Sequence, residues 1–213
     1  MDSNYWHQRW EKNELGFHES EANPLLFKYF NELSLAQGSR VFVPLCGKTL
    51  DIAWLLSNGF CVVGAELSEI AIAQLFAELG VAPNISVVGD VKHYSAKNID
   101  IFVGDIFTVS SKTLGLVDAV YDRAALVALP EEMRHRYTAH LMKITAKAPQ
   151  LLITLTYDQN VMDGPPFSIS DAEVNQHYRD SYHLTRLESA CVPGGLKGKC
   201  EAMESVWLLK AVD

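Results

Sequence analysis

The sequence predicts an α/β fold, with a doubly wound, mostly parallel sheet of seven strands that ends in an antiparallel hairpin. Short apolar runs of strand length alternate with segments whose apolar residues recur at helical spacing. The last two runs are separated only by a Gly- and Lys-rich stretch, too short for a crossover helix. A chain of 213 residues with 48% hydrophobic content can bury a large core, and we expect one domain over residues 1–213.

The first βαβ unit is expected between residues 40 and 66. Strands are predicted at 40–43 and 61–66, and the helix between them should end near Gly59. Ser68 is a candidate N-cap for the next helix, and Gly80 follows its last apolar residue as a stop signal.

Later elements follow the same alternation. Pro130 is expected to open a long helix, with Glu131 and Glu132 in its first turn, where negative charge suits the helix dipole. The remaining strands are predicted at residues 99–107, 116–123, 151–157, 183–192 and 204–212.

Composition excludes several classes of function. A net charge of −8 argues against a duplex nucleic-acid binder, which usually needs a basic face, so small ligands are the expected partners. No run of about 18 apolar residues occurs, and we expect no membrane segment and a cytoplasmic monomer. The four cysteines lack Cys-x-x-Cys spacing, and the histidines show no ligand spacing, so no metal site is expected.

The stretch RVFVPLCGK, residues 40–48, raises the question of a phosphate-binding loop, since Gly47, Lys48 and Thr49 match the end of that motif. The motif also needs a glycine five positions before Gly47, and that position holds Phe42. A dinucleotide would require Gly-x-Gly-x-x-Gly, whereas this loop has one glycine. An NAD oxidoreductase is therefore disfavoured, and a nucleoside cofactor without a pyrophosphate fits better.

Polar residues at the strand ends indicate where that cofactor binds. In a doubly wound sheet, ligands lie beyond the carboxyl ends of the strands. Glu66 ends the second strand about 20 residues after Gly47, the spacing at which an acid accepts hydrogen bonds from ribose hydroxyls. S-adenosylmethionine has a ribose and no phosphate, and it is the cofactor we expect.

Several motifs together closely resemble the thiopurine S-methyltransferase family, bacterial type. They occur in the same order over nearly the whole chain and are W-x-x-x-W from Trp6 to Trp10, GFHE, RVFVPLCGK, VVGAELSE, DRAALVAL and GPPF. The resemblance implies a Rossmann-like class I S-adenosylmethionine-dependent fold.

The family likeness also implies roles for particular residues. Those expected to contact the cofactor are Trp10, Leu45, Gly47, Glu66, Ile106 and Arg123. The GPPF loop, with Pro166, would close over the acceptor beside Phe17. Residues 1–30 form an aromatic-rich segment that we expect to act as a helical lid, because aromatic faces suit a sulfonium and a flat heterocycle.

Methyl transfer to sulfur depends mainly on alignment and exclusion of water, and we assign no catalytic residue. Arg123 can donate to a purine nitrogen or hold an anionic acceptor, while Asp122 would orient that arginine or a backbone amide. The expected acceptors are thiopurines and other aromatic or heterocyclic thiols, with selenium or tellurium species as further candidates. Two alternatives remain: a related methyltransferase for thiocyanate, halide or aliphatic thiols, and a cofactor-binding protein without catalysis.

Overall fold

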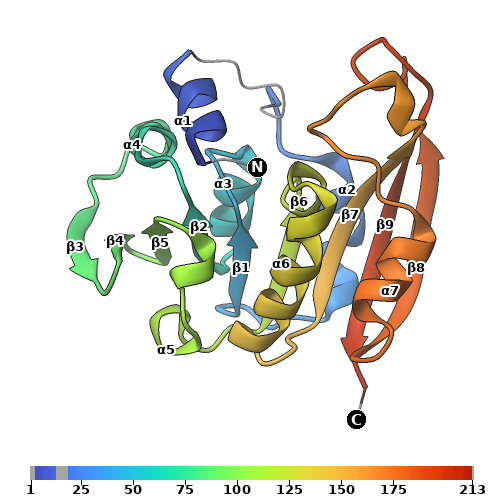
Figure 1. The fold of residues 1–213 in the computed structure, drawn as a ribbon. Helices are drawn as coiled ribbons and strands as arrows, with labels where there is room; N and C mark the ends of the chain where they lie inside the picture. Colours follow the sequence, from blue (N-terminus) through green and yellow to red (C-terminus); the bar gives the residue numbers. More distant parts are fainter. Residues whose placement is uncertain (1–2, 13–18, 213) are drawn as a thin grey trace. The chain divides into compact units, whose positions relative to one another are not determined.

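The computed structural model describes residues 3–12 and 19–212, which contain nine strands and seven α-helices (Figure 1). They form two compact units, residues 1–119 and 120–213, which are described separately here. The single methyltransferase domain over 1–213 and the lid over 1–30 stay predictions.

The first unit carries five strands in the order β3-β4-β5-β2-β1. Its strands are β1 (Arg40–Pro44), β2 (Cys61–Glu66), β3 (Asn84–Val88), β4 (Val91–Ala96) and β5 (Ile99–Val103). Its α-helices are α1 (Ser3–Glu11), α2 (Pro24–Tyr29), α3 (Leu50–Ser57), α4 (Glu69–Glu78) and α5 (Ser111–Leu114). β5, β2 and β1 are parallel, whereas β3 and β4 add an antiparallel hairpin at the edge.

The predicted βαβ signals of this unit are confirmed. Ser68 caps α4 by accepting a hydrogen bond from the Ala71 amide, and Gly59 and Gly80 follow α3 and α4 with φ angles of 83° and 67°. One long-range contact that the sequence pattern does not predict also fixes a helix in place. The buried Asp51 of α3 accepts a 2.7 Å hydrogen bond from the backbone of Asn23, the N-cap of α2, and so fixes the start of that helix.

The second unit has the strand order β6-β7-β9-β8. Its strands are β6 (Ala119–Arg123), β7 (Gln150–Tyr157), β8 (Tyr182–Cys191) and β9 (Ala202–Ala211), and its α-helices are α6 (Glu131–Ile144) and α7 (Asp171–Tyr178). β6 and β7 are parallel, and the terminal β8–β9 pair is antiparallel as predicted. The α/β class is confirmed.

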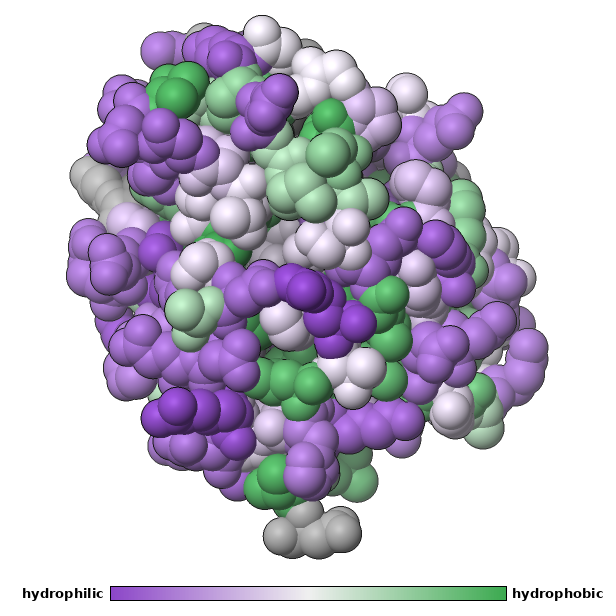
Figure 2. Space-filling view, turned by 90° about the vertical axis from the view of Figure 1, so that its right-hand side faces the viewer, coloured by the Kyte–Doolittle hydropathy of each residue, from purple (hydrophilic) through white to green (hydrophobic). Residues whose placement is uncertain are grey.

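The side of the molecule that carries β8 and α7 is mostly hydrophilic, with small separate apolar groups (Figure 2). β8 is an edge strand of its unit, and its register shifts between Arg186 and Glu188. Arg186 also pairs with Asp171 of α7 and lies over the Trp207 ring, at 5.7 Å from its centroid. Charged side chains and a register irregularity are common devices that prevent an edge strand from pairing with another chain.

The number of strands differs from the prediction. Nine strands occur in the described residues instead of seven, because β3 and β4 lie where no strand was predicted. These two strands join through the two-residue turn Gly89-Asp90, with Gly89 at φ 60°. A glycine at the first position of such a turn is a hairpin signal that could have been recognised. β5 also ends at Val103, four residues earlier than predicted, because residues 106–108 form a 3₁₀ turn capped by Asp105.

A buried acid in β6 makes stability depend on pH. Burial raises the pKa of Asp122 from 3.8 to about 6, although hydrogen bonds from Tyr137 and from backbone amides oppose this rise. Between these pH values the folded state retains a proton that the unfolded chain has released, so stability falls as pH rises. The stabilising contribution is present below about pH 4 and lost above about pH 6.

We therefore expect Asp122→Asn to remove this dependence, because an amide does not titrate. The free energy of unfolding of the parent, minus that of the variant, should decrease by about 2–3 kcal/mol from pH 4 to pH 6.5, given ~1.4 kcal/mol per pKa unit. Urea unfolding of both proteins across this range measures the difference. A constant difference would contradict the prediction.

Candidate functional site

The loop after β1 turns sharply at two residues. Leu45 and Gly47 have φ angles of 45° and 51°, and the Cys46 amide donates a 3.0 Å hydrogen bond to the carbonyl of Ala65 in β2. A positive φ is uncommon for leucine and is typical of functional loops. Gly47 also packs closely on α1, because an added Cβ would lie 3.2 Å from the Trp10 ring, which would then have to shift slightly. The loop therefore brings the predicted residues Trp10, Leu45 and Gly47 together.

Glu66 holds this loop in place. It ends β2 with 6% exposure, and its two oxygens accept 2.8 Å hydrogen bonds from the backbone amides of Gly47 and Ser68. Burial raises the pKa of Glu66, while these amides and the charge of His7 act in the opposite direction. A carboxylate has about four lone-pair positions, so Glu66, which also receives a hydrogen bond from the Leu67 amide, retains capacity for a further donor such as a ribose hydroxyl.

The end of β5 lies directly beside Glu66. The Gly104 amide donates a 2.9 Å hydrogen bond to the Glu66 carbonyl, and the 3₁₀ turn that follows carries the buried Ile106. The side chain of Asp105 caps this turn by accepting from the Phe107 amide at 2.9 Å. Ile106 thus follows the strand whose last residue, Val103, pairs with Glu66, and its contact with the cofactor stays a prediction.

A cavity of about 590 Å³ opens at the ends of β2 and β5, within the first unit. Its walls come from α1, the start of α4, the β3–β4 turn and the end of β5, and include His7, Leu67, Ser68, Asp90, Val103 and Gly104. A nucleoside fits within such a volume, but none of the residues predicted to contact the cofactor lines this cavity; Glu66 and Trp10 lie next to its lining residues in the chain or close to them. The turn residues of the hairpin were not predicted as part of the site, although Gly89-Asp90 could have indicated that a turn reaches this edge of the sheet.

The predicted residues of the second unit form a separate group. Arg123 ends β6 and is half-buried, and the next residue, Ala124, has a φ of 62°. The fully buried Asp122 accepts hydrogen bonds from the Tyr137 hydroxyl at 2.7 Å and from the Leu126 amide at 3.1 Å. Of the two roles expected for Asp122, the contact with a backbone amide is the one observed.

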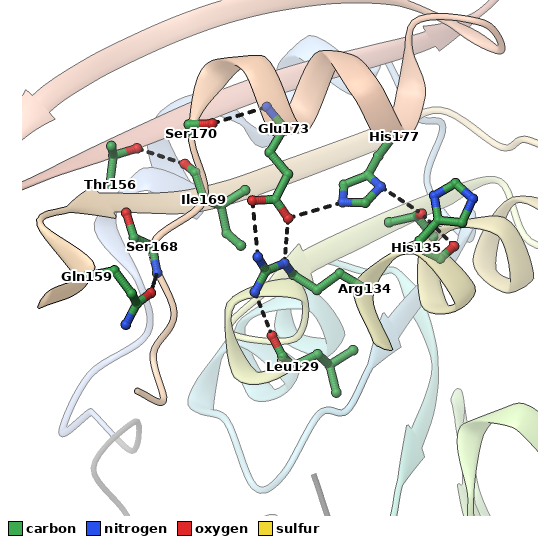
Figure 3. A network of polar contacts seen from close by, with 11 residues as sticks. Leu129, Arg134, His135, Thr156, Gln159, Ser168, Ile169, Ser170, Glu173 and His177 are labelled. Atoms are coloured by element: carbon green, nitrogen blue, oxygen red, sulfur yellow. Dashed lines mark hydrogen bonds and ion pairs between the residues drawn. The ribbon is translucent and has the colours of Figure 1, made fainter. Parts of the chain in front are cut away.

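Pro166 is buried in a loop between β7 and α7 that side chains hold at several points (Figure 3). The Ser168 amide donates to the side-chain oxygen of Gln159 at 2.8 Å, and the Thr156 hydroxyl donates to the carbonyl of Ile169 at 2.8 Å. The Phe167 amide donates to the Val127 carbonyl at 2.6 Å. An added Cβ on Gly164, which has φ 77°, would lie 2.6 Å from the Phe167 ring, so these residues pack closely.

An ion pair between α6 and α7 supports the same loop. The guanidinium of Arg134 binds both carboxylate oxygens of Glu173 and donates to the Leu129 carbonyl at 2.9 Å (Figure 3). It also lies 5.9 Å from the centroid of the Phe167 ring. His177 also contacts Glu173 at 3.2 Å. Burial favours a higher pKa for Glu173, but hydrogen bonds from His177 and Arg134 outweigh it and lower the pKa.

Two predictions about sites remain to be placed. Phe17 lies outside the described residues, so its role stays a prediction. Across residues 3–12 and 19–212, no group of three or more His, Cys, Asp or Glu side chains could hold a metal ion. None of the helices in these ranges is long and apolar enough to cross a membrane.

Comparisons with known proteins agree over the whole chain. A family profile described as Thiopurine S-methyltransferase (TPMT) matches residues 1–210. The thiopurine S-methyltransferase of Xanthobacter autotrophicus is 55% identical over 211 residues, covering 99% of both chains. That of Teredinibacter turnerae is 52% identical over 209 residues, covering 98% of this chain and 97% of the relative.

A solved structure supports the fold independently. The 1,6-didemethyltoxoflavin-N1-methyltransferase of Burkholderia thailandensis, with S-adenosylhomocysteine bound, aligns with a TM-score of 0.66 at 14% identity, covering 99% of this chain and 87% of that one. At that identity the likeness establishes the fold alone. The family match confirms the predicted enzyme class, a methyltransferase that uses S-adenosylmethionine. By sequence, over nearly its whole length, this chain belongs to the thiopurine S-methyltransferase family.

Proposed function

We propose that this enzyme methylates the sulfur of thiopurines and other aromatic or heterocyclic thiols, and that selenium and tellurium compounds are further acceptors. The observation that carries the proposal is the 55% identity, over 99% of both chains, to a relative named thiopurine S-methyltransferase. Aliphatic thiols, thiocyanate and halide are the alternative acceptors. Transfer of a labelled methyl group to a panel of these compounds tests the proposal, and preference for an alternative acceptor over every aryl thiol would overturn it.

The cofactor would be held by the first unit. Glu66 would accept a hydrogen bond from a ribose hydroxyl, Leu45 and Gly47 would present the loop backbone, and Trp10 and Ile106 would supply apolar contacts. When bound, S-adenosylmethionine supplies an electrophilic methyl group on a sulfonium. Three features of the structure fit it: spare acceptor capacity on Glu66, a one-glycine loop that offers no pyrophosphate cradle, and the cavity beside Leu67.

Arg123 and the Pro166 loop would hold the acceptor. A guanidinium suits a purine nitrogen or a thiolate, because it donates in a planar arrangement. Asp122 is an unsuitable general base, since it is fully buried and already accepts from Tyr137 and Leu126. A separate base is unnecessary for an aryl thiol, which is partly ionised near neutral pH. The residues therefore act by binding, aligning and excluding water.

The first prediction concerns Glu66. Glu66→Ala should weaken binding of S-adenosylhomocysteine by about 1.5–3 kcal/mol, because hydrogen bonds to a charged acceptor are lost and the Gly47 amide loses its partner. Calorimetry measures the affinity. Glu131→Gln is a suitable control, since it removes the charge of an exposed acid at the start of α6, outside the first unit. Unchanged affinity in a folded Glu66 variant would exclude its role in the cofactor site.

The second prediction concerns Arg123. Arg123→Lys keeps the charge but loses the planar fork, so kcat/KM for an aryl thiol should fall by about tenfold while the melting temperature changes little. One aryl thiol and one small inorganic acceptor should be compared. An equal loss on both acceptors would assign Arg123 to the cofactor, and a lower melting temperature with turnover preserved would assign it to the fold.

The third prediction concerns the Pro166 loop, residues 164–167, which is the proposed acceptor loop. Gly164→Ala forces a positive φ on alanine and places a methyl group against the Phe167 ring, so the loop must move. We expect a higher KM for the thiol and an unchanged affinity for S-adenosylhomocysteine. Gly194→Ala is the matched control, because Gly194 has φ 74° and nothing within 4 Å of an added Cβ. If both variants behave alike in the kinetic assay, the loop does not border the acceptor.

A further inference from the structure

The buried polar pair behind Arg123 has no part in the chemistry described so far. Asp122 and Tyr137 are 0% exposed, and the Tyr137 hydroxyl donates to Oδ2 of Asp122 at 2.7 Å. Burial raises the pKa of the Tyr137 phenol well above its usual value, so this hydroxyl remains protonated and acts as a donor. Burying a carboxylate is unfavourable unless hydrogen bonds compensate it. A chain that needed only packing at this position could use an apolar residue.

The other oxygen of Asp122 closes the turn through which the chain leaves β6. Oδ1 accepts from the Leu126 amide at 3.1 Å, four residues further on. Between them, Ala124 has a φ of 62°, which is unfavourable for alanine and needs outside support. Asp122 therefore fixes the backbone on both sides of Arg123, and with it the direction in which that side chain departs.

The support for Asp122 comes from outside the turn. Tyr137 lies near the middle of α6, a 14-residue helix whose start is tied to α7 by the Arg134–Glu173 ion pair. The helix thus offers a rigid donor to the carboxylate. The chain of contacts runs from α6 through Tyr137 and Asp122 to the turn that carries Arg123.

We propose that Asp122 and Tyr137 are positioning residues that orient Arg123 for binding the thiol acceptor. The inference rests on the proposed role of Arg123. It differs from a purely structural role in one respect: removing the Tyr137 hydroxyl should matter for the acceptor only while Arg123 is present.

A double-mutant cycle tests the proposal on the full chain, with a purine thiol as acceptor. Tyr137→Phe should lower kcat/KM for the thiol about tenfold, since a displacement of ~1 Å can cost as much as ~10²-fold. In the Arg123→Lys background the same substitution should change kcat/KM by less than about twofold, while its effect on the melting temperature stays the same in both backgrounds. The affinity for S-adenosylhomocysteine should not change.

Tyr182→Phe is the matched control. Its hydroxyl is equally buried in the second unit but donates to the Ala148 carbonyl at 3.1 Å, so its loss should lower the melting temperature and leave kcat/KM unchanged. Asp122→Asn provides a second variant with the same expected non-additivity.

The outcomes separate the two hypotheses. If Tyr137→Phe acts like the control, or lowers kcat/KM equally with Arg and Lys at position 123, the positioning role is wrong while the proposed function stands. If Arg123→Lys itself leaves acceptor kinetics unchanged, both the role of Arg123 and the positioning role are overturned. Loss of the Tyr137 effect in the Lys background supports the proposal.

Discussion

The hydrogen bonds from the Gly47 and Ser68 amides to the Glu66 carboxylate are the interaction on which the proposed cofactor-binding residues of the first unit depend. One side chain fixes the loop after β1 and the start of α4, while its own backbone carbonyl receives the Gly104 amide from the end of β5. Three segments that carry the proposed cofactor-binding residues therefore converge on Glu66. Backbone amides, which are rigid donors, partly offset the cost of burying this charge, although burial still raises the pKa of Glu66.

The second unit uses the same device at Asp122, with an instructive difference. Glu66 is the last residue of β2, and Asp122 is the next-to-last residue of β6. Each acid accepts a hydrogen bond from a backbone amide outside its own strand: Glu66 from Gly47 and Asp122 from Leu126. Glu66 has two amide donors, whereas Asp122 takes one of its donors from the Tyr137 side chain. The first arrangement depends only on the course of the backbone. The second also depends on a particular residue of α6.

The parts of the fold that could be predicted are those that local physics determines. The run of apolar residues in β1 and β2, the serine cap of α4 and the glycines after α3 and α4 each act over a few positions. The position of Glu66 at a strand end could be predicted as well, because strand length and spacing fix it. The amides that Glu66 binds could not, since they depend on how the Gly47 loop folds back.

The features that were missed depend on pairing between distant residues. Strand β3 is exposed along its length, and its alternation of polar and apolar residues extends only from Asn84 to Val87, which is too short to indicate a strand clearly. The contact between Asp51 and Asn23 and the ion pair between Arg134 and Glu173 join residues 28 and 39 positions apart. No local sequence pattern specifies such partners. From the sequence alone, Asp51 and Glu173 could equally have been exposed to solvent. Phe17 and the first residues of the chain lie outside the described residues, so their part in the site was not tested.

The candidate cofactor residues of the first unit and the candidate acceptor residues of the second unit are therefore stabilised in different ways, and this bears on the proposed specificity. The proposed cofactor residues of the first unit are held by hydrogen bonds that backbone amides donate to the Glu66 carboxylate. Because these donors belong to the backbone, side-chain substitutions at other positions can change this arrangement little. The acceptor loop is held by contacts between side chains and backbone at Gln159, Ser168 and Thr156, and by the Phe167 ring above Arg134. A few substitutions at such positions can reshape the loop without disturbing Glu66. Under the proposed function, selectivity among thiols would thus be able to change independently of cofactor binding.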